Sequence, residues 1–168
     1  MAAATSKRCL RRYPTARWAL GAFVCALLLP MVSEAQTLRL IDGDEVHEVD
    51  VEQLRQHSTS RFQLFDPYQG ETVEMQGMPF ADFLVRQFGR VPPTLRFTAW
   101  DGYEVTLGGW GNPNWYLVTS ENGQPLSLRS RGPVRLVERD YGNRDVTALR
   151  EFNDWIWMIR SIEAVDKL

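Results

Sequence analysis

The stretch Leu95 to Leu107, LRFTAWDGYEVTL, decides how the middle of this 168-residue chain folds. Apolar and polar residues alternate on both sides of an Asp-Gly pair, which is typical of two antiparallel strands joined by a short turn. A two-residue loop would mix the two faces of this hairpin. A three-residue loop, Trp100 to Gly102, pairs Phe97 with Val105 and gathers the apolar side chains on one face. We therefore predict a hairpin with an indole and a carboxylate at its tip, and with its glycine in the left-handed third position that such loops favour.

A second tryptophan-bearing loop follows this hairpin directly. Residues 108–114, GGWGNPN, show neither strand nor helix periodicity. An indole offers a stacking face, and amide or carboxylate side chains can bind the polar edge of a flat heteroaromatic or sugar ring. We expect such a ring to be bound by Trp100, Trp110, Asp101, Asn112 and Asn114. In the alternative interpretation the two indoles fold back into the core, where we also expect Trp115, Trp155 and Trp157.

The remaining patterns predict one α+β domain, mostly β, over residues 36–168. Two helices are expected: Val51 to His57 after Asp50 as N-cap, and Pro79 to Phe88 before Gly89. A helical turn is expected at 147–152. The expected strands are 37–41, 62–65, 95–107 with its hairpin turn, 115–128, 134–138, and 155–165 as a buried central strand. The sequence contains no internal repeat and no linker.

The first 35 residues have the pattern of a signal peptide. Five basic residues precede the apolar run Trp18 to Val32, and Ser33-Glu34-Ala35 places small residues at positions −3 and −1 of a cleavage site. We expect cleavage before Gln36 and export, into a bacterial periplasm. The alternative is an uncleaved membrane anchor, for which the apolar run is short.

Removal of that leader changes the charge of the chain. It leaves 14 basic and 20 acidic residues, a net charge of −6, which argues against nucleic acid as a partner. Residues 127–150 nevertheless contain six arginines and three acidic residues. This basic segment is a place to look for an anionic ligand or an acidic partner; the alternative is a solvated surface.

The metal-ligating residue types are sparse after residue 35. Cys9 and Cys25 both belong to the leader, so the remaining chain has no thiolate ligand and no disulfide. His47 and His57 show no metal-ligand spacing. We expect no bound metal. We expect no catalytic residue either, because no histidine or thiol is placed to activate a nucleophile.

Four segments, taken in order, resemble the sulfite-oxidase-type molybdopterin-binding fold. They are EMQGMPFADFL at 74–84, AWDGY at 99–103, NGQPL with RGPVRLV at 122–126 and 131–137, and WIWMIRSI at 155–162. In the enzymes of that family a cysteine thiolate ligates molybdenum, whereas this chain reads RFQLFD at 61–66, where the cysteine would fall. The chain therefore looks like the small stand-alone periplasmic members that bind a reduced pterin without molybdenum.

The resemblance implies a non-enzymatic pterin-binding protein whose partner is the periplasmic domain of a membrane-bound signalling protein, such as one that makes or degrades cyclic di-GMP. Asp101 is suited to accept the N3–H and 2-amino donors of a pterin ring. The candidate donors to its O4 are Arg131, Arg135, Asn112 and Arg144, and the candidate stacking residues are Trp100, Tyr103, Trp110 and Tyr141. Two alternatives stay open: an accessory or electron-transfer subunit that docks a redox enzyme, and a carbohydrate-binding module.

Overall fold

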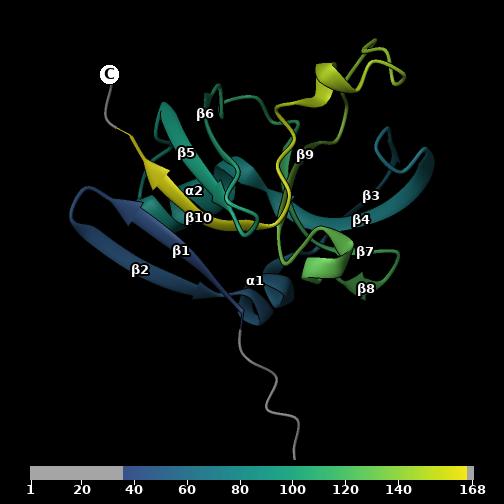
Figure 1. The fold of residues 1–168 in the computed structure, drawn as a ribbon. Helices are drawn as coiled ribbons and strands as arrows, with labels where there is room; N and C mark the ends of the chain where they lie inside the picture. Colours follow the sequence, from purple (N-terminus) through teal and green to yellow (C-terminus); the bar gives the residue numbers. More distant parts are fainter. Residues whose placement is uncertain (1–35, 166–168) are drawn as a thin grey trace, which may run out of the picture. The chain divides into compact units, whose positions relative to one another are not determined.

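The computed structural model describes residues 36–165, which form a mostly β domain with two α-helices (Figure 1). The predicted α+β class is confirmed. The predicted signal peptide lies outside the described residues. Among residues 36–165, neither helix is long and apolar enough to cross a membrane.

The first sheet has five strands in the order β2-β1-β10-β5-β6. The outer pair on one side is β1 (Thr37–Asp42) and β2 (Glu45–Asp50), and the pair on the other is β5 (Thr94–Ala99) and β6 (Glu104–Gly108). Between them lies β10 (Ile159–Ala164), parallel to β1 and antiparallel to β5. The expected central strand thus exists, but it begins at Ile159 and not at residue 155.

The β5–β6 hairpin has the predicted register. Phe97 pairs with Val105, and the amide of Gly102 donates to the carbonyl of Ala99 at 3.1 Å. Gly102 has a φ of +86°, in the left-handed region that favours glycine. The tip of the hairpin therefore carries Trp100 and Asp101, as the alternation of apolar residues predicted.

The second sheet is built around β7 (Trp115–Glu121), whose residues are buried up to Ser120. Next to it lie β4 (Glu71–Pro79) and then β3 (Ser60–Asp66), and its other neighbours are β8 (Gln124–Pro125) and β9 (Arg135–Glu138). The expected strand at 115–128 is thus broken by a turn at 122–123, where both residues have positive φ. Strands β2 and β4 were not predicted from the sequence.

Both helices form where the sequence predicts them. In α1 (Val51–His57) the Asp50 side chain accepts from the amide of Gln53 at 2.9 Å, as an N-cap does. In α2 (Phe80–Phe88) the inward face buries Phe80, Phe83 and Leu84, and Gly89 ends the helix with a φ of +69°. The expected turn at 147–152 is a 3-10 helix, η2 (Leu149–Phe152). One apolar core joins both sheets and both helices.

Candidate functional site

A pocket of about 270 Å³ opens beside the tip of the β5–β6 hairpin. Three segments far apart in the sequence line it: the hairpin, the turn between β3 and β4, and the segment that precedes β10. Their lining residues are Tyr68, Ala99, Asp101, Tyr103, Asn153, Trp155, Ile156 and Trp157. The volume lies just below the roughly 300–1,000 Å³ typical of small-molecule sites, so the pocket fits a ligand of one or two rings.

Tyr68 forms a fixed wall of this pocket. Its ring meets the ring of Trp157 edge-on, with centroids 4.6 Å apart. Its hydroxyl donates to the carbonyl oxygens of Phe152 at 3.0 Å and Leu149 at 3.2 Å. Burial raises the pKa of the Tyr68 hydroxyl, with the negative charges of Asp154 and Asp66 adding to that effect. The hydroxyl therefore stays protonated, and it fastens the β3–β4 turn to η2.

Asp101 supplies the carboxylate of the pocket. Its Oδ1 accepts from the amide of Tyr103 at 3.0 Å, which holds the side chain in a local turn at the hairpin tip. Within residues 36–165, its Oδ2 makes no hydrogen bond and no ion pair. A carboxylate has about four lone-pair sites, so Asp101 keeps most of its capacity to accept hydrogen bonds from a ligand. Tyr103, 48% exposed, lines the same pocket.

Ion pairs at Arg144 anchor the segment that carries Asn153 and Trp155. The guanidinium of Arg144 donates to the carbonyl of Glu151 at 2.8 Å, and it pairs with Asp154 at 3.0 Å and with the buried carboxylate of Glu138 at the end of β9. Arg144 was expected to donate to a ligand; because its donors are engaged here, it positions the pocket wall instead.

The prediction that Trp155 lies in the core is confirmed, and this buried indole also lines the pocket. Trp157, likewise expected in the core, is half-buried and lines the pocket instead. The ring of Trp155 is buried and packs edge-on against Phe152 and Tyr141, with centroids 5.1 and 6.0 Å away. Tyr141, a predicted stacking residue, therefore lies behind the pocket wall and not in the pocket. The sequence interpretation missed Tyr68 and Asn153, for which no local pattern gives a signal.

The structure corrects the prediction for Trp110. Its side chain is 1% exposed and packs edge-on against Phe80, Phe97 and Trp115, with ring centroids 5.1–5.6 Å apart. The alternative interpretation of this indole is confirmed, because the glycines around it let the loop fold back and bury its large apolar area. Trp100 is 45% exposed at the hairpin tip, where the Arg160 guanidinium lies 5.9 Å from its ring centre, but it is not part of the pocket lining.

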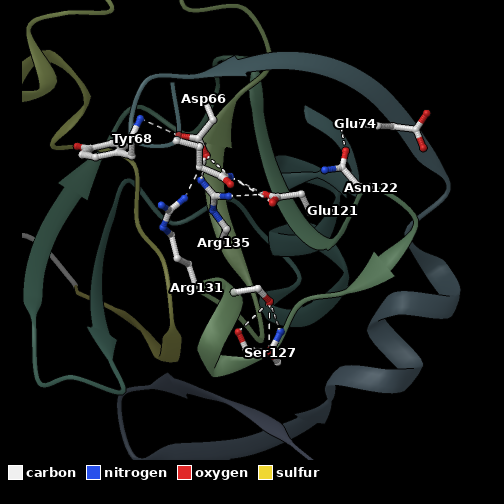
Figure 2. A network of polar contacts seen from close by, with 10 residues as sticks. Asp66, Tyr68, Glu74, Glu121, Asn122, Ser127, Arg131 and Arg135 are labelled. Atoms are coloured by element: carbon white, nitrogen blue, oxygen red, sulfur yellow. Dashed lines mark hydrogen bonds and ion pairs between the residues drawn. The ribbon is translucent and has the colours of Figure 1, made fainter. Parts of the chain in front are cut away.

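Arg135 is likewise structural and not available to a ligand. This fully buried guanidinium donates from Nη2 to Oδ2 of Asp66 at 2.7 Å and from Nη1 to Oε2 of Glu121 at 2.8 Å (Figure 2). Burial opposes ionisation of Asp66, but Arg135 and hydrogen bonds from Gln69 and Tyr68 outweigh it and hold the pKa of Asp66 below its ordinary value. This buried ion cluster ties β3 to β9 and β7.

Three further predicted ligand residues lie outside the pocket. Asn112 and Asn114 lie on the exposed loop before β7, where Oδ1 of Asn112 accepts from the amide of Asn114 at 3.0 Å. Arg131 lies near the buried cluster, 3.6 Å from Asp66. Of the ten predicted residues, the structure thus brings Asp101 and Tyr103 together in the pocket.

The residues at 61–66 do not fit the molybdenum site that the enzymes of the resembled family have. They form β3, they include no thiolate, and their one carboxylate, Asp66, is held by Arg135. In residues 36–165 no three His, Cys, Asp or Glu side chains gather where they could hold a metal ion.

Comparison with known proteins bears on the fold. No protein-family model and no curated protein matches this sequence. The structure is similar to that of the sulfane dehydrogenase SoxCD from Paracoccus pantotrophus, with a TM-score of 0.52 and 15% sequence identity. The match covers 79% of this chain but 38% of the SoxCD chain, so this protein spans well under half of that neighbour. The predicted resemblance is thereby supported as a related fold.

Proposed function

We propose that this protein is a non-enzymatic pterin-binding protein and that its ligand is a reduced pterin seated in the aromatic pocket. The observation that carries the proposal is that Asp101, whose Oδ2 has no partner among residues 36–165, lines a pocket together with Tyr68, Tyr103 and Trp157. A pterin ring is planar and presents two adjacent N–H donors along one edge. A carboxylate accepts such a pair in a bidentate arrangement, and the aromatic side chains contact the ring faces.

The pocket chemistry favours binding over catalysis. Its lining includes one carboxylate, two tyrosines and one asparagine, and none of the lining residues is a serine, cysteine or lysine that a base could activate as a nucleophile. The hydroxyl of Tyr68 is committed to two backbone carbonyls. Since the residues at 61–66 provide no thiolate, no molybdenum-dependent step is assigned.

The proposal is tested by titrating purified protein with a reduced pterin under anaerobic conditions and following tryptophan fluorescence. Asp101→Asn should raise the Kd about 10- to 150-fold, because hydrogen bonds to a charged group contribute about 1.5–3 kcal/mol. Asp140→Asn is the matched control: this exposed carboxylate also accepts from a backbone amide two residues on, that of Gly142 at 2.9 Å, but it does not line the pocket. An Asp101→Asn protein that is folded and binds pterin like the wild type would refute the proposal.

The same proposal places the protein in the periplasm, with the periplasmic domain of a membrane signalling protein, such as a cyclic di-GMP synthase or phosphodiesterase, reading the bound state. It is supported by the leader pattern and by Trp100, whose indole is exposed beside the pocket lining residue Asp101. Exposed tryptophans are frequent energetic centres of interfaces. The test is affinity capture from membranes, with and without pterin. The wild-type protein should recover such a partner, and a variant in which Trp100 is replaced should not. Recovery of a soluble redox enzyme instead would favour the accessory-subunit alternative.

A further inference from the structure

A second pocket, of about 280 Å³, is lined by none of the residues of the first. It is lined by Gln69, Glu121, Arg129, Ser130 and Arg131. Tyr68 and Gln69 are neighbours in the β3–β4 turn, yet they line different pockets. We propose that this second pocket, the arginine pocket, binds a small oxyanion of the phosphate class. This inference is independent of pterin binding.

The charges of the buried ion cluster beside this pocket are already balanced. Asp66 and Glu121 share the guanidinium of Arg135, and the side-chain amide of Gln69 donates to Asp66 at 2.9 Å and to Glu121 at 3.1 Å. Arg131 adds the second positive charge, 3.6 Å from Asp66. The formal charges of the two carboxylates and the two guanidiniums sum to zero, so the carboxylate of Glu121 does not give the pocket a net negative charge.

Arg129 then gives the arginine pocket an uncompensated positive charge. Its guanidinium is exposed and makes no hydrogen bond or ion pair with any residue from 36 to 165. Arg131, whose side chain is 33% exposed, has its ion pair beyond hydrogen-bond length and keeps its N–H donors. Two planar guanidiniums with free donors, one of them in excess over the local carboxylates, form the arrangement that binds oxyanions in bidentate fashion.

The backbone that carries the two arginines is held in place before any ligand binds. The amide of Ser127 donates to Oγ of Ser130 at 2.8 Å, and that hydroxyl lies 3.2 Å from Oγ of Ser127 (Figure 2). Arg131 follows with a φ of +62°, and the amide of Gly132 donates back to the carbonyl of Ser127 at 2.7 Å. A loop already ordered loses little further entropy on binding, which favours even a small ligand.

The test is a titration of the ¹⁵N-labelled protein with inorganic phosphate by NMR, at ionic strength held constant with chloride. We expect saturable shifts at the amides of Gln69, Ser130 and Arg131. Arg129→Gln should raise the Kd about tenfold, equivalent to about 1.4 kcal/mol, without changing the fold, since this side chain has no partner in the described part of the chain to lose. Arg129→Lys should restore part of the affinity, because it keeps the charge without the planar fork. Arg39→Gln, an exposed arginine on β1 in the other sheet, is the control and should bind phosphate normally.

A parallel titration with glycerol phosphate distinguishes the source of the anion. Tighter binding of the ester would indicate a small organic phosphate as ligand, and tighter binding of inorganic phosphate would indicate the free ion; both support the site. Shifts that do not saturate, or equal Kd values for wild type and Arg129→Gln, would overturn it. Pterin affinity should be the same in Arg129→Gln and wild type, so the failure of one site does not imply failure of the other.

Discussion

Replacing Arg135 by methionine should destabilise the protein by about 3–5 kcal/mol, the usual effect of removing one partner from a buried ion pair. The guanidinium is 1% exposed, and it is the cation that both Asp66 and Glu121 face at hydrogen-bond distance. Methionine fills similar space but leaves Asp66, fully buried, with a charge that no water reaches. A domain of this size has about 5–15 kcal/mol of total stability, so the variant should retain its fold with a much reduced margin.

The same loss can be expressed as a change in melting temperature. Unfolding entropy is about 2.1 cal/mol/K per residue near 60 °C, or about 0.27 kcal/mol/K for residues 36–165. A loss of 3–5 kcal/mol therefore lowers the Tm by about 11–18 °C. Arg129→Met removes an exposed arginine that has no partner among residues 36–165, and it should change stability by no more than about 0.5 kcal/mol.

The loss should also depend on pH, because Asp66 titrates differently in the two proteins. In the wild type the pKa of Asp66 is held below its unfolded value, so its contribution is present above the unfolded pKa and is lost as pH falls through the folded one. Without Arg135 the carboxyl keeps its burial but loses its nearest cation, so its folded pKa rises above that of the wild type. The stability of the variant therefore rises relative to that of the wild type as the pH falls.

Urea unfolding at pH 7 and at pH 4.5 measures both effects. The difference between wild type and Arg135→Met should be largest at pH 7 and smaller at pH 4.5. A loss below 1 kcal/mol at pH 7 would show that Asp66 is neutral or hydrated in the folded protein. A loss that is equal at the two pH values would contradict the assignment of the effect to the carboxylates.

Two further pairs of substitutions test the packing. Trp110→Ala should cost about 3–5 kcal/mol because it opens a cavity in the core, whereas Trp100→Ala should cost less than about 0.5 kcal/mol; their urea midpoints separate the two indoles. Gly77→Ala should destabilise by about 1–3 kcal/mol or more, since its Cβ would lie 2.3 Å from the carbonyl oxygen of Leu117 on the neighbouring strand; Gly111→Ala, which meets open space, is the control in the same thermal melts.

The parts of the fold that were predictable are those in which local pattern and burial agree. Alternation fixed the β5–β6 register, because only one loop length puts Phe97 and Val105 on one face. The apolar spacing in α2, with Gly89 after it, determined a helix in the same way. Strand β2 was missed because it is an exposed edge strand, EVHEVD, whose pairing with β1 provides hydrogen bonds but little burial.

The pocket was only partly predictable because its walls come from distant segments. Asp101 and Tyr103 belong to one turn, and that turn has a recognisable sequence. Tyr68 and Asn153 reach the same space only after β3, β4 and β10 have assembled. Neither residue lies in a sequence motif that indicates a ligand-binding role. The error at Trp110 has a related cause: a glycine-rich loop permits an indole to point either way, and the choice depends on whether Phe80 and Phe97 leave room for it.

Asp66 and Asp101 show why residue type alone does not identify a ligand-binding carboxylate. Asp66 is the last residue of β3, Asp101 lies in the loop just after β5, and each accepts a hydrogen bond from the backbone amide two residues on. Asp66 is buried, and Arg135 and Gln69 take up its remaining capacity. Asp101 is exposed at a hairpin tip, and no residue from 36 to 165 neutralises it. The distinction between a structural and a binding carboxylate thus lies in which arginine reaches it, and that depends on the pairing of β9 with β7, a contact that no local sequence pattern specifies.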